Sequence, residues 1–329
     1  MPMNDGIGRR SFFTAGAGIL AAPILLRNMS VAQAADTAEG KGKQVPQISQ
    51  FKLGNFNFTV VRDGTGILEK PNETFGTDQK AETVAQELEK NFLPTDKIVN
   101  SYSPTLIDTG AERVLVDTGF GASGREKGSG QLLAGLKEAG YDPTDITIVA
   151  LTHLHGDHIG GLMENGEPAF KNARYVTGET EFNFWTDKAR QGTPAEGNHK
   201  AVMANVAPLK DRFTFLKDGD TIVSGMSAVL APGHTPGHMI FNVESEKARL
   251  VMTGDTANHY ILSLQHPDWQ VRFDMDKAQA AATRRRVFDM LAAERVPFLG
   301  YHMPFPAVGF VEKYQDGYRF VPKTYQFDL

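Results

Sequence analysis

The stretch THLHGDHIGG constrains the fold more than any other part of this sequence. It places three histidines and an aspartate within six positions, directly after the apolar, β-rich run ITIVAL. His153 and His155 are two residues apart, so on extended backbone their side chains point to the same side. Gly156 permits a turn, after which Asp157 and His158 begin a helix and face a neighbouring point. This spacing suits two adjacent metal ions better than one.

Three later strand ends supply further candidate ligands. An apolar run precedes His234 in LAPGHTPGH, Asp255 in LVMTGDT and His302 in FLGYHMPFP. A mixture of imidazole and carboxylate groups suits Zn²⁺, Mn²⁺, Fe²⁺ or Co²⁺. A carboxylate can bridge two cations, and Asp255 is the natural bridge. The sequence therefore predicts a site for two divalent metal ions, whose seven ligands are His153, His155, Asp157, His158, His234, Asp255 and His302.

The N-terminal residues predict an export signal. Arg9 and Arg10 precede a small-residue apolar stretch, and Ala32 and Ala34 occupy the small positions before a cleavage site. The paired arginines resemble a twin-arginine signal, which carries folded proteins. We expect residues 1–34 to be a signal peptide and the mature protein to be periplasmic or secreted, with no stable membrane anchor. A general secretory signal or a short anchor is the alternative.

The remaining sequence predicts a linker at residues 35–48 and one domain at residues 49–329. Strand and helix patterns alternate along that domain. The longest helix is expected at residues 276–295, and hairpins are expected at residues 103–119 and 309–322. This alternation indicates an α/β protein with two mixed sheets covered by helices.

Composition excludes several classes of function. The chain has no cysteine, which rules out a disulfide framework, a thiolate nucleophile and cysteine metal ligands. The formal net charge is −5, and residues 1–34 carry three arginines against one aspartate, so the rest of the chain is more acidic still. Acidic proteins rarely bind nucleic acid as their main partner. We therefore expect a small-molecule substrate and no nucleic acid.

Four motifs resemble the metallo-β-lactamase superfamily. THLHGDH, PGHTPGH, TGD and GYHMPFP occur in the order of that superfamily, and VLVDTG is similar to its early Asp-Thr-Gly strand end. GGLM, FW, HTPGH and GYRFVP look most like methyl parathion hydrolase and its lactonase-like relatives. The resemblance covers about residues 50–325. It implies a four-layer αββα sandwich in a single domain, and a homodimer.

The resemblance also assigns roles to the candidate residues. The implied ligand sets are His153, His155 and His234 for one ion, Asp157, His158 and His302 for the other, and Asp255 as the bridge. Asp117 is expected to hydrogen-bond a ligand histidine. Zn²⁺ is the expected ion, with Mn²⁺, Co²⁺ or Fe²⁺ as alternatives.

Two cations about 3.5–4 Å apart lower the pKa of a bridging water. The resulting hydroxide is expected to attack a small lactone, an aryl ester or a phosphotriester, with Asp157 or Asp255 passing a proton to the leaving group. Four more side chains are predicted to line the substrate pocket: Phe120, Trp185, His199 and His259. Asn198 stands where methyl parathion hydrolase would carry an aromatic residue, which disfavours phosphotriesters. His238 is expected to shape its loop.

Two other functions stay open. A glyoxalase-II-like thioesterase shares all seven ligands, although the C-terminal region has no obvious basic cluster for glutathione. A non-catalytic metal-binding protein on the same scaffold is the other alternative. His155 argues against the oxygen-reducing di-iron relatives, which carry a carboxylate there. The missing cysteine and the presence of Asp255 argue against β-lactam hydrolysis.

Overall fold

The computed structural model describes residues 47–324. The predicted signal peptide lies outside the described residues, as does most of the predicted linker. Strand β1 (Gln47–Leu53) begins two residues before the predicted domain start at residue 49. Among the described residues, no helix combines the length and the apolar character needed to cross a membrane.

The first sheet has seven strands in the order β1-β2-β5-β6-β7-β10-β11. Its further strands are β2 (Phe56–Arg62), β5 (Thr105–Asp108), β6 (Arg113–Val116), β7 (Ile148–Ala150), β10 (Arg174–Gly178) and β11 (Phe213–Leu216). Strands β6, β7, β10 and β11 run parallel, whereas β1, β2 and β5 pair antiparallel. The antiparallel pair β5–β6 confirms the hairpin predicted at residues 103–119.

The second sheet also has seven strands, in the order β12-β13-β14-β15-β16-β17-β18. They are β12 (Thr221–Val223), β13 (Met226–Leu230), β14 (Met239–Ser245), β15 (Ala248–Gly254), β16 (Phe298–Gly300), β17 (Val308–Tyr314) and β18 (Gly317–Pro322). The predicted C-terminal hairpin is confirmed as β17–β18. It extends this sheet and buries Val308 and Tyr318, so it belongs to the core.

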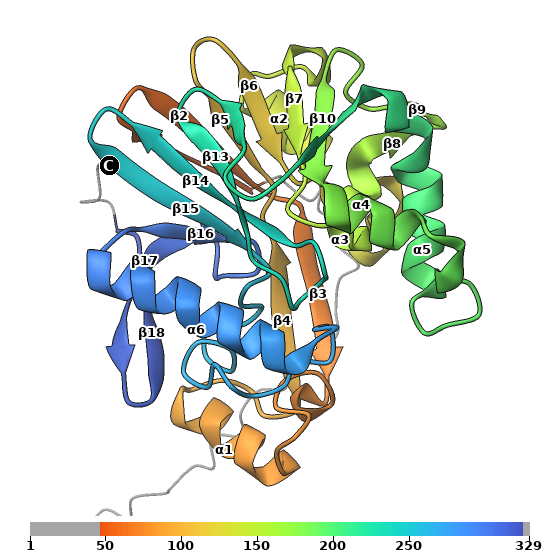
Figure 1. Cartoon of the computed structure of the whole chain (residues 1–329). Helices are drawn as coiled ribbons and strands as arrows, with labels where there is room; N and C mark the ends of the chain where they lie inside the picture. Colours follow the sequence, from red (N-terminus) through yellow and green to blue (C-terminus); the bar gives the residue numbers. More distant parts are fainter. Residues whose placement is uncertain (1–46, 325–329) are drawn as a thin grey trace, which may run out of the picture. The chain divides into compact units, whose positions relative to one another are not determined.

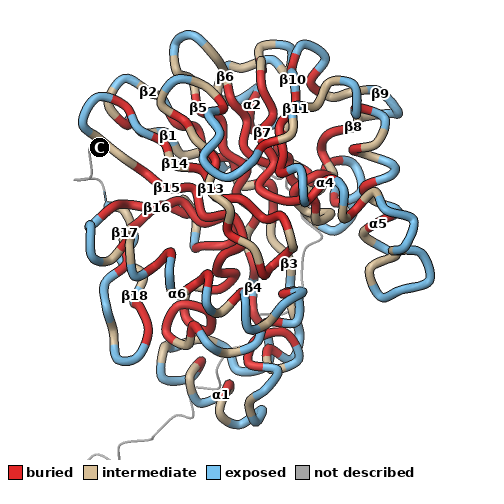
Figure 2. Tube along the Cα trace, viewed as in Figure 1, coloured by how far each residue is buried: buried red, intermediate tan, exposed pale blue. Residues whose placement is uncertain are grey.

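Alternating side chains place the first sheet between two apolar layers. On β2, Phe58 and Val60 pack against the second sheet, whereas Val61 packs under the helices on the opposite face. That helical layer contains α2 (Leu132–Glu138), α4 (Glu179–Thr186) and α5 (Glu196–Asn205). Helix α6 (Lys277–Glu294) contributes Val287 and Phe288 to the core of the second sheet. The chain therefore has the predicted αββα order of layers, with buried residues concentrated between them (Figures 1 and 2).

Shorter elements surround this sandwich. Strands β3 (Gly64–Glu69) and β4 (Lys97–Tyr102) form an antiparallel ribbon that runs from the sheets towards α1 (Ala81–Lys90) (Figure 1). Helix α3 (Gly156–Ile159) has a single turn. The remaining strands are β8 (Met163–Glu164) and β9 (Glu167–Pro168). The 3-10 helices are η1 (Pro71–Glu73), η2 (Gly121–Lys127), η3 (Pro143–Asp145), η4 (Gly160–Leu162), η5 (Lys188–Arg190) and η6 (Ala207–Arg212).

Candidate metal centre

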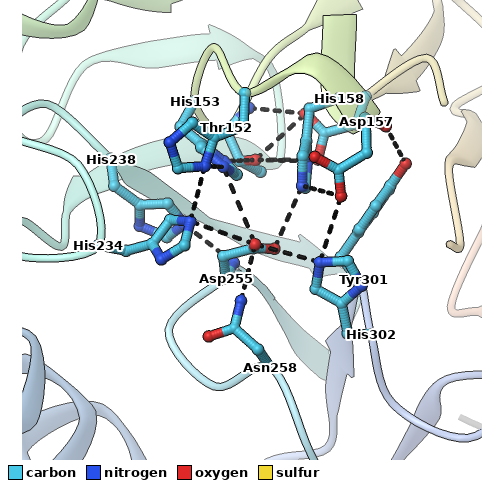
Figure 3. A network of polar contacts seen from close by, with 12 residues as sticks. Thr152, His153, Asp157, His158, His234, His238, Asp255, Asn258, Tyr301 and His302 are labelled. Carbon is cyan, nitrogen blue, oxygen red and sulfur yellow. Dashed lines mark hydrogen bonds and ion pairs between the residues drawn. The ribbon is translucent and has the colours of Figure 1, made fainter. Parts of the chain in front are cut away.

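The predicted ligands lie at or just after strand ends and come close together. Figure 3 labels all of them except His155. His153 and His155 follow β7, and α3 then carries Asp157 and His158. The other three follow strands of the second sheet: His234 comes after β13, Asp255 after β15 and His302 after β16. The two sheets thus bring together side chains that are up to 149 positions apart in the sequence.

Three imidazoles form the first ligand group. His153 Nε2 and His234 Nε2 each lie 3.0 Å from His155 Nδ1. One ring nitrogen can share only one proton with a neighbour, so hydrogen bonding satisfies at most one of these two contacts. Three nitrogens that face a common point are instead the arrangement that binds a cation, and these three residues form a potential metal-binding group.

The second group contains Asp157, His158 and His302. Asp157 Oδ2 lies 3.6 Å from His158 Nε2 and 3.5 Å from His302 Nε2. Asp255 stands between the two groups: its Oδ2 is 3.3 Å from His234 Nε2 and 3.1 Å from His302 Nε2, and its Oδ1 is 3.3 Å from His158 Nε2. This is the position that a bridging carboxylate requires.

Asp117 fixes the ring of His158 in the second group. Its Oδ2 accepts a hydrogen bond from His158 Nδ1 at 2.9 Å, and its Oδ1 accepts one from the Thr152 amide at 2.9 Å. Asp117 has a φ of 57°, which is uncommon for a residue other than glycine and marks functional sites. The structure therefore places Asp117 where the sequence analysis expects it, against a candidate ligand histidine.

A second supporting carboxylate, Asp274, was not predicted. Its Oδ1 accepts from His234 Nδ1 at 2.9 Å, and its Oδ2 accepts from Arg284 Nη2 at 2.9 Å. Both partners of this ion pair are 1% exposed. Arg284 also donates to the carbonyl oxygens of Thr256 and Pro267. No sequence motif marks Asp274, because it lies in an irregular segment after Phe273 and acts only through the folded chain.

The other imidazoles are fixed in the same way. His302 Nδ1 donates to the carbonyl oxygen of Ser101 at 2.9 Å, and His153 Nδ1 lies 3.1 Å from Thr152 Oγ1. Partners of this kind set the ring orientation and the tautomer of a metal-binding histidine. Four of the five candidate imidazoles therefore have their outer nitrogen held and their inner nitrogen directed at the cluster.

Burial and charge act differently on the two groups. Burial lowers the pKa of His153 and His155 well below the usual value, and neighbouring imidazoles lower it further. Both rings are therefore neutral, which is the form that binds a metal. Burial also acts to lower the pKa of His158, but the negative charges of Asp255, Asp117 and Asp157 outweigh it and raise that pKa well above the usual value. The second group thus attracts positive charge.

The residues fit a pair of divalent cations. His158 Nε2 and Asp255 Oδ1 are buried and lie 3.3 Å apart, but within the described residues neither atom has a hydrogen bond of acceptable geometry. Such orphaned atoms are costly unless a ligand satisfies them. The donor set is five imidazoles and two carboxylates, which suits zinc and similar transition metals.

A cavity of about 410 Å³ opens in front of the cluster. Phe120 lines it, as predicted. Three other predicted pocket residues do not. Trp185 is 2% exposed and packs beneath His155, with ring centres 5.6 Å apart. His199 is buried behind it and donates through Nδ1 to the Trp185 carbonyl oxygen at 2.7 Å. Helices α4 and α5 turn both side chains towards the core.

His259 is the third of these residues. It lines a neighbouring cavity of about 320 Å³, which shares Asn100 and His302 with the first. Its Nδ1 accepts the amide protons of Ile261 and Leu262 at 3.2 and 3.0 Å. Burial lowers the pKa of His259 to about 3. Its side chain therefore stabilises the turn that follows β15.

His238 shapes its loop, as the sequence predicts. Its Nδ1 donates to the Ala231 carbonyl oxygen at 3.1 Å, and its Nε2 accepts the amide proton of Asp255 at 3.0 Å. His238 is absent from the potential metal-binding groups of the described residues. It thus positions Asp255 through the backbone.

Comparison with known families identifies this architecture. The family model of the metallo-beta-lactamase superfamily matches residues 98–298. The chain belongs to the metallo-β-lactamase superfamily. The match runs from β4 to the first residue of β16 and includes six of the seven candidate ligands; His302 lies four residues beyond its end.

Several relatives of this superfamily member are hydrolases. An N-acyl homoserine lactonase of Bacillus cereus is 26% identical over 216 residues, which cover 60% of this chain and 79% of that protein. Another lactonase, from a Bacillus species, is 28% identical, but the match spans only 53% of its length.

Two solved structures are also similar. The dizinc quorum-quenching lactonase AidC has a TM-score of 0.80 and 26% identity, with 85% of this chain and 99% of that chain covered. The hydrolase AbOPH has a TM-score of 0.79 and 28% identity, with 86% and 99% covered. The chain is thus a metal-dependent hydrolase, as the sequence predicts.

Proposed function

We propose that this protein uses two divalent metal ions to hydrolyse small, uncharged lactones. The observation that carries the proposal is the position of Asp255, which faces the His153–His155–His234 group and the Asp157–His158–His302 group at once. The similarity to N-acyl homoserine lactonases and to the dizinc enzyme AidC supports lactones and zinc.

The ions would supply the chemistry that the side chains lack: they polarise a carbonyl or phosphoryl group and lower the pKa of water. The side chains hold and orient. Asp157 and Asp255 differ in access, because their carboxylates are 20% and 4% exposed. Both residues line the cavity, and the Tyr301 hydroxyl donates to the Asp157 backbone carbonyl at 2.6 Å. Asp157 is therefore the better placed of the two to pass a proton to a leaving group.

The cavity favours a neutral substrate. It is lined by the metal-site residues, by the apolar side chains of Leu68, Phe120 and Phe273, and by carboxamides such as that of Asn198. No lysine or arginine is among the described residues that line it. An anionic group on a substrate would therefore find no cationic side chain in this cavity. Uncharged lactones, esters and phosphotriesters all meet this condition, and the similarity to N-acyl homoserine lactonases favours lactones among them.

A thioesterase is the second candidate. An atrochrysone carboxyl ACP thioesterase of Aspergillus fumigatus is 31% identical over 153 residues, which are 46% of this chain and 38% of that protein. The lining of the cavity disfavours a thioester of an anionic carrier, for the reason just given. A thioesterase acting on such a carrier would need basic residues near the mouth.

The proposal includes export through the predicted signal at residues 1–34, which lie outside the described residues. Arg9, Arg10 and the small residues up to Ala34 support it. Sequencing the N-terminus of the mature protein would test it: a start near Ala35 is expected, and an intact N-terminus on active protein would contradict export.

A substrate panel with metal analysis tests the activity. Purified protein is assayed on an N-acyl homoserine lactone, a simple lactone, an aryl ester, a phosphotriester and an anionic thioester. About two metal ions per chain and the highest kcat/KM on a lactone are expected. Unchanged hydrolysis by metal-free protein would contradict the mechanism, and a preference for the thioester would favour the second candidate.

A further inference from the structure

Glu181 is a buried carboxylate in contact with both histidine loops of the site. It lies in the first turn of α4 and is 0% exposed. Its Oε1 accepts the amide proton of Leu154 at 3.0 Å, and its Oε2 accepts that of Gly237 at 2.9 Å. Its two oxygens therefore bind two loops that are 83 positions apart in the sequence.

Both amides lie in the segments that carry the three imidazoles. Leu154 lies between His153 and His155, and Gly237 lies in the loop that begins with His234. One carboxylate thus joins the two segments that supply the whole three-imidazole group. Neither Asp117 nor Asp274 does this, because each supports one ligand ring and does not contact the backbone of both loops.

The packing around Glu181 leaves it little freedom. A Cβ on Gly237 would lie 2.2 Å from the backbone nitrogen of Glu181, so only glycine allows the loop to approach the helix this closely. Trp185 Nε1 donates to Glu181 Oε1 at 2.8 Å, and the Trp185 ring packs against His155. Asn198 holds the same peptide from its other side by donating to the Leu154 carbonyl at 2.8 Å. The connection is therefore fixed by short contacts on every side.

We propose that Glu181 is a positioning residue that sets the spacing of the His153–His155 pair relative to His234 and thereby controls the affinity of this one metal site. The proposal rests on the proposed function in one respect, namely that the three imidazoles hold a metal. Among the described residues, no hydrogen bond joins Glu181 to the Asp157–His158–His302 group, so that metal site is expected to be independent of Glu181.

The substitution Glu181→Gln separates these roles. Glutamine has the same shape but only one acceptor oxygen, and its NH₂ group can only donate. The glutamine oxygen can accept either from Leu154 and Trp185 or from Gly237. In both cases the NH₂ group faces the backbone N–H of the other loop. One of the two loops is released while the volume of the core is unchanged.

The test compares wild-type protein with Glu181→Gln by metal analysis and by chelator competition with Zn²⁺. Wild-type protein is expected to bind two ions. In Glu181→Gln, one ion is expected to lose affinity by about 10–100-fold, as when other groups that orient metal ligands are removed, while the other ion is retained. Co²⁺-substituted protein should show a changed absorption spectrum for one site only.

Glu179→Gln is the matched control, because Glu179 is exposed on the same helix and the change in charge is the same. It should bind both ions as the wild type does. Two wild-type affinities in folded Glu181→Gln would overturn the inference, whereas a wild-type protein that binds no metal would overturn the proposed function itself.

A second measurement does not depend on the variant folding. In metal-free wild-type protein, the amide protons of Leu154 and Gly237 should exchange slowly with solvent, because Glu181 holds them without help from a metal. Rapid exchange of these two amides in otherwise folded protein would show that Glu181 does not fix the loops.

Discussion

The candidate ligands form the floor of the cavity, and the other lining residues form its wall. These two parts are built in different ways. On the floor, the candidate ligands follow strands of the two main sheets, and buried groups such as Asp117 and Asp274 fix their rings. Part of the wall comes from the β3–β4 ribbon, which turns Leu68 and Asn100 to the cavity and leaves Ile67 and Val99 each 63% exposed to solvent. The floor is thus held mainly by buried side chains, except that the Ser101 carbonyl of the ribbon holds His302. This part of the wall has solvent on its other side.

This difference indicates that the floor carries the chemistry and the wall selects the substrate. Bond-breaking chemistry needs ligands held in place, and buried hydrogen bonds achieve this. Substrate choice depends on side chains that can change without disturbing the ligands. Substitutions on the floor should therefore alter metal binding and stability, and substitutions on the wall should alter the preference among substrates.

The largest effect is expected from Asp255→Ala, which removes the carboxylate between the two ligand groups. The metal content should fall below two ions per chain. The value of kcat should fall by at least about 10²-fold, the loss seen when one group that stabilises charge in a transition state is removed. Elemental analysis and a lactone assay measure both. A fully active Asp255→Ala enzyme would break the assignment of the floor to catalysis.

Asp274→Ala tests the buried ion pair that fixes the ring of His234. It leaves Arg284 buried without its carboxylate partner, and it frees the outer nitrogen of His234. The free energy of unfolding should fall by about 3–5 kcal/mol, as for other broken buried ion pairs. Urea unfolding measures it.

The control is Asp268→Ala, which breaks an exposed ion pair with Arg285. Arg285 lies next to Arg284 on α6. Exposed pairs contribute about 0–1 kcal/mol, so this variant should stay close to the wild type. Equal losses in the two variants would contradict the special role of Asp274.

Leu68→Ala and Phe273→Ala test the wall. Each removes an apolar group from the cavity lining. The ratio of kcat/KM between a long-chain and a short-chain lactone should change by about tenfold, because each methylene that a pocket recognises contributes about 1–3 kcal/mol. Metal content should stay at the wild-type value. A loss of metal in either variant would mean that wall and floor are not independent.

The smallest expected effect is a loss of folding stability at acidic pH. Burial acts to raise the pKa of Asp274, but the hydrogen bond from His234 and the charge of Arg284 outweigh it and hold that pKa below its ordinary value of 3.8. The folded state therefore binds this proton less tightly than the unfolded state does. The stabilisation is present above pH about 4 and is lost as the pH falls through the folded-state value.

Urea unfolding of metal-free protein between pH 6 and pH 3 would measure this loss. Asp274→Asn should show a shallower decline over that range, because the amide does not titrate. An identical decline in both proteins would assign the acid sensitivity to other carboxyl groups.

The sequence predicts those elements whose apolar pattern is long or bounded by turn residues. The helix at residues 276–295 is α6, and the hairpin around Gly110 is β5–β6. The helix expected after His158 is only one turn, because Gly160 and Gly161 follow it and the chain passes into β8. Strand β14 was not predicted, although its MIFNV run is apolar and β-rich.

The sequence by itself predicted two mixed sheets covered by helices and seven candidate ligands, because each candidate lies at or just after the end of a strand whose apolar pattern is local; the four-layer order was implied by the family resemblance. Only the tertiary structure decided what supports the candidate ligands. Glu181, Asp274 and Arg284 act across 10 to 56 positions of sequence through contacts such as Glu181–Gly237 and Asp274–Arg284. Tertiary packing also turned Trp185 and His199 into the core and away from the cavity. A local pattern states which face of an element is apolar, but not which distant groups that face will meet.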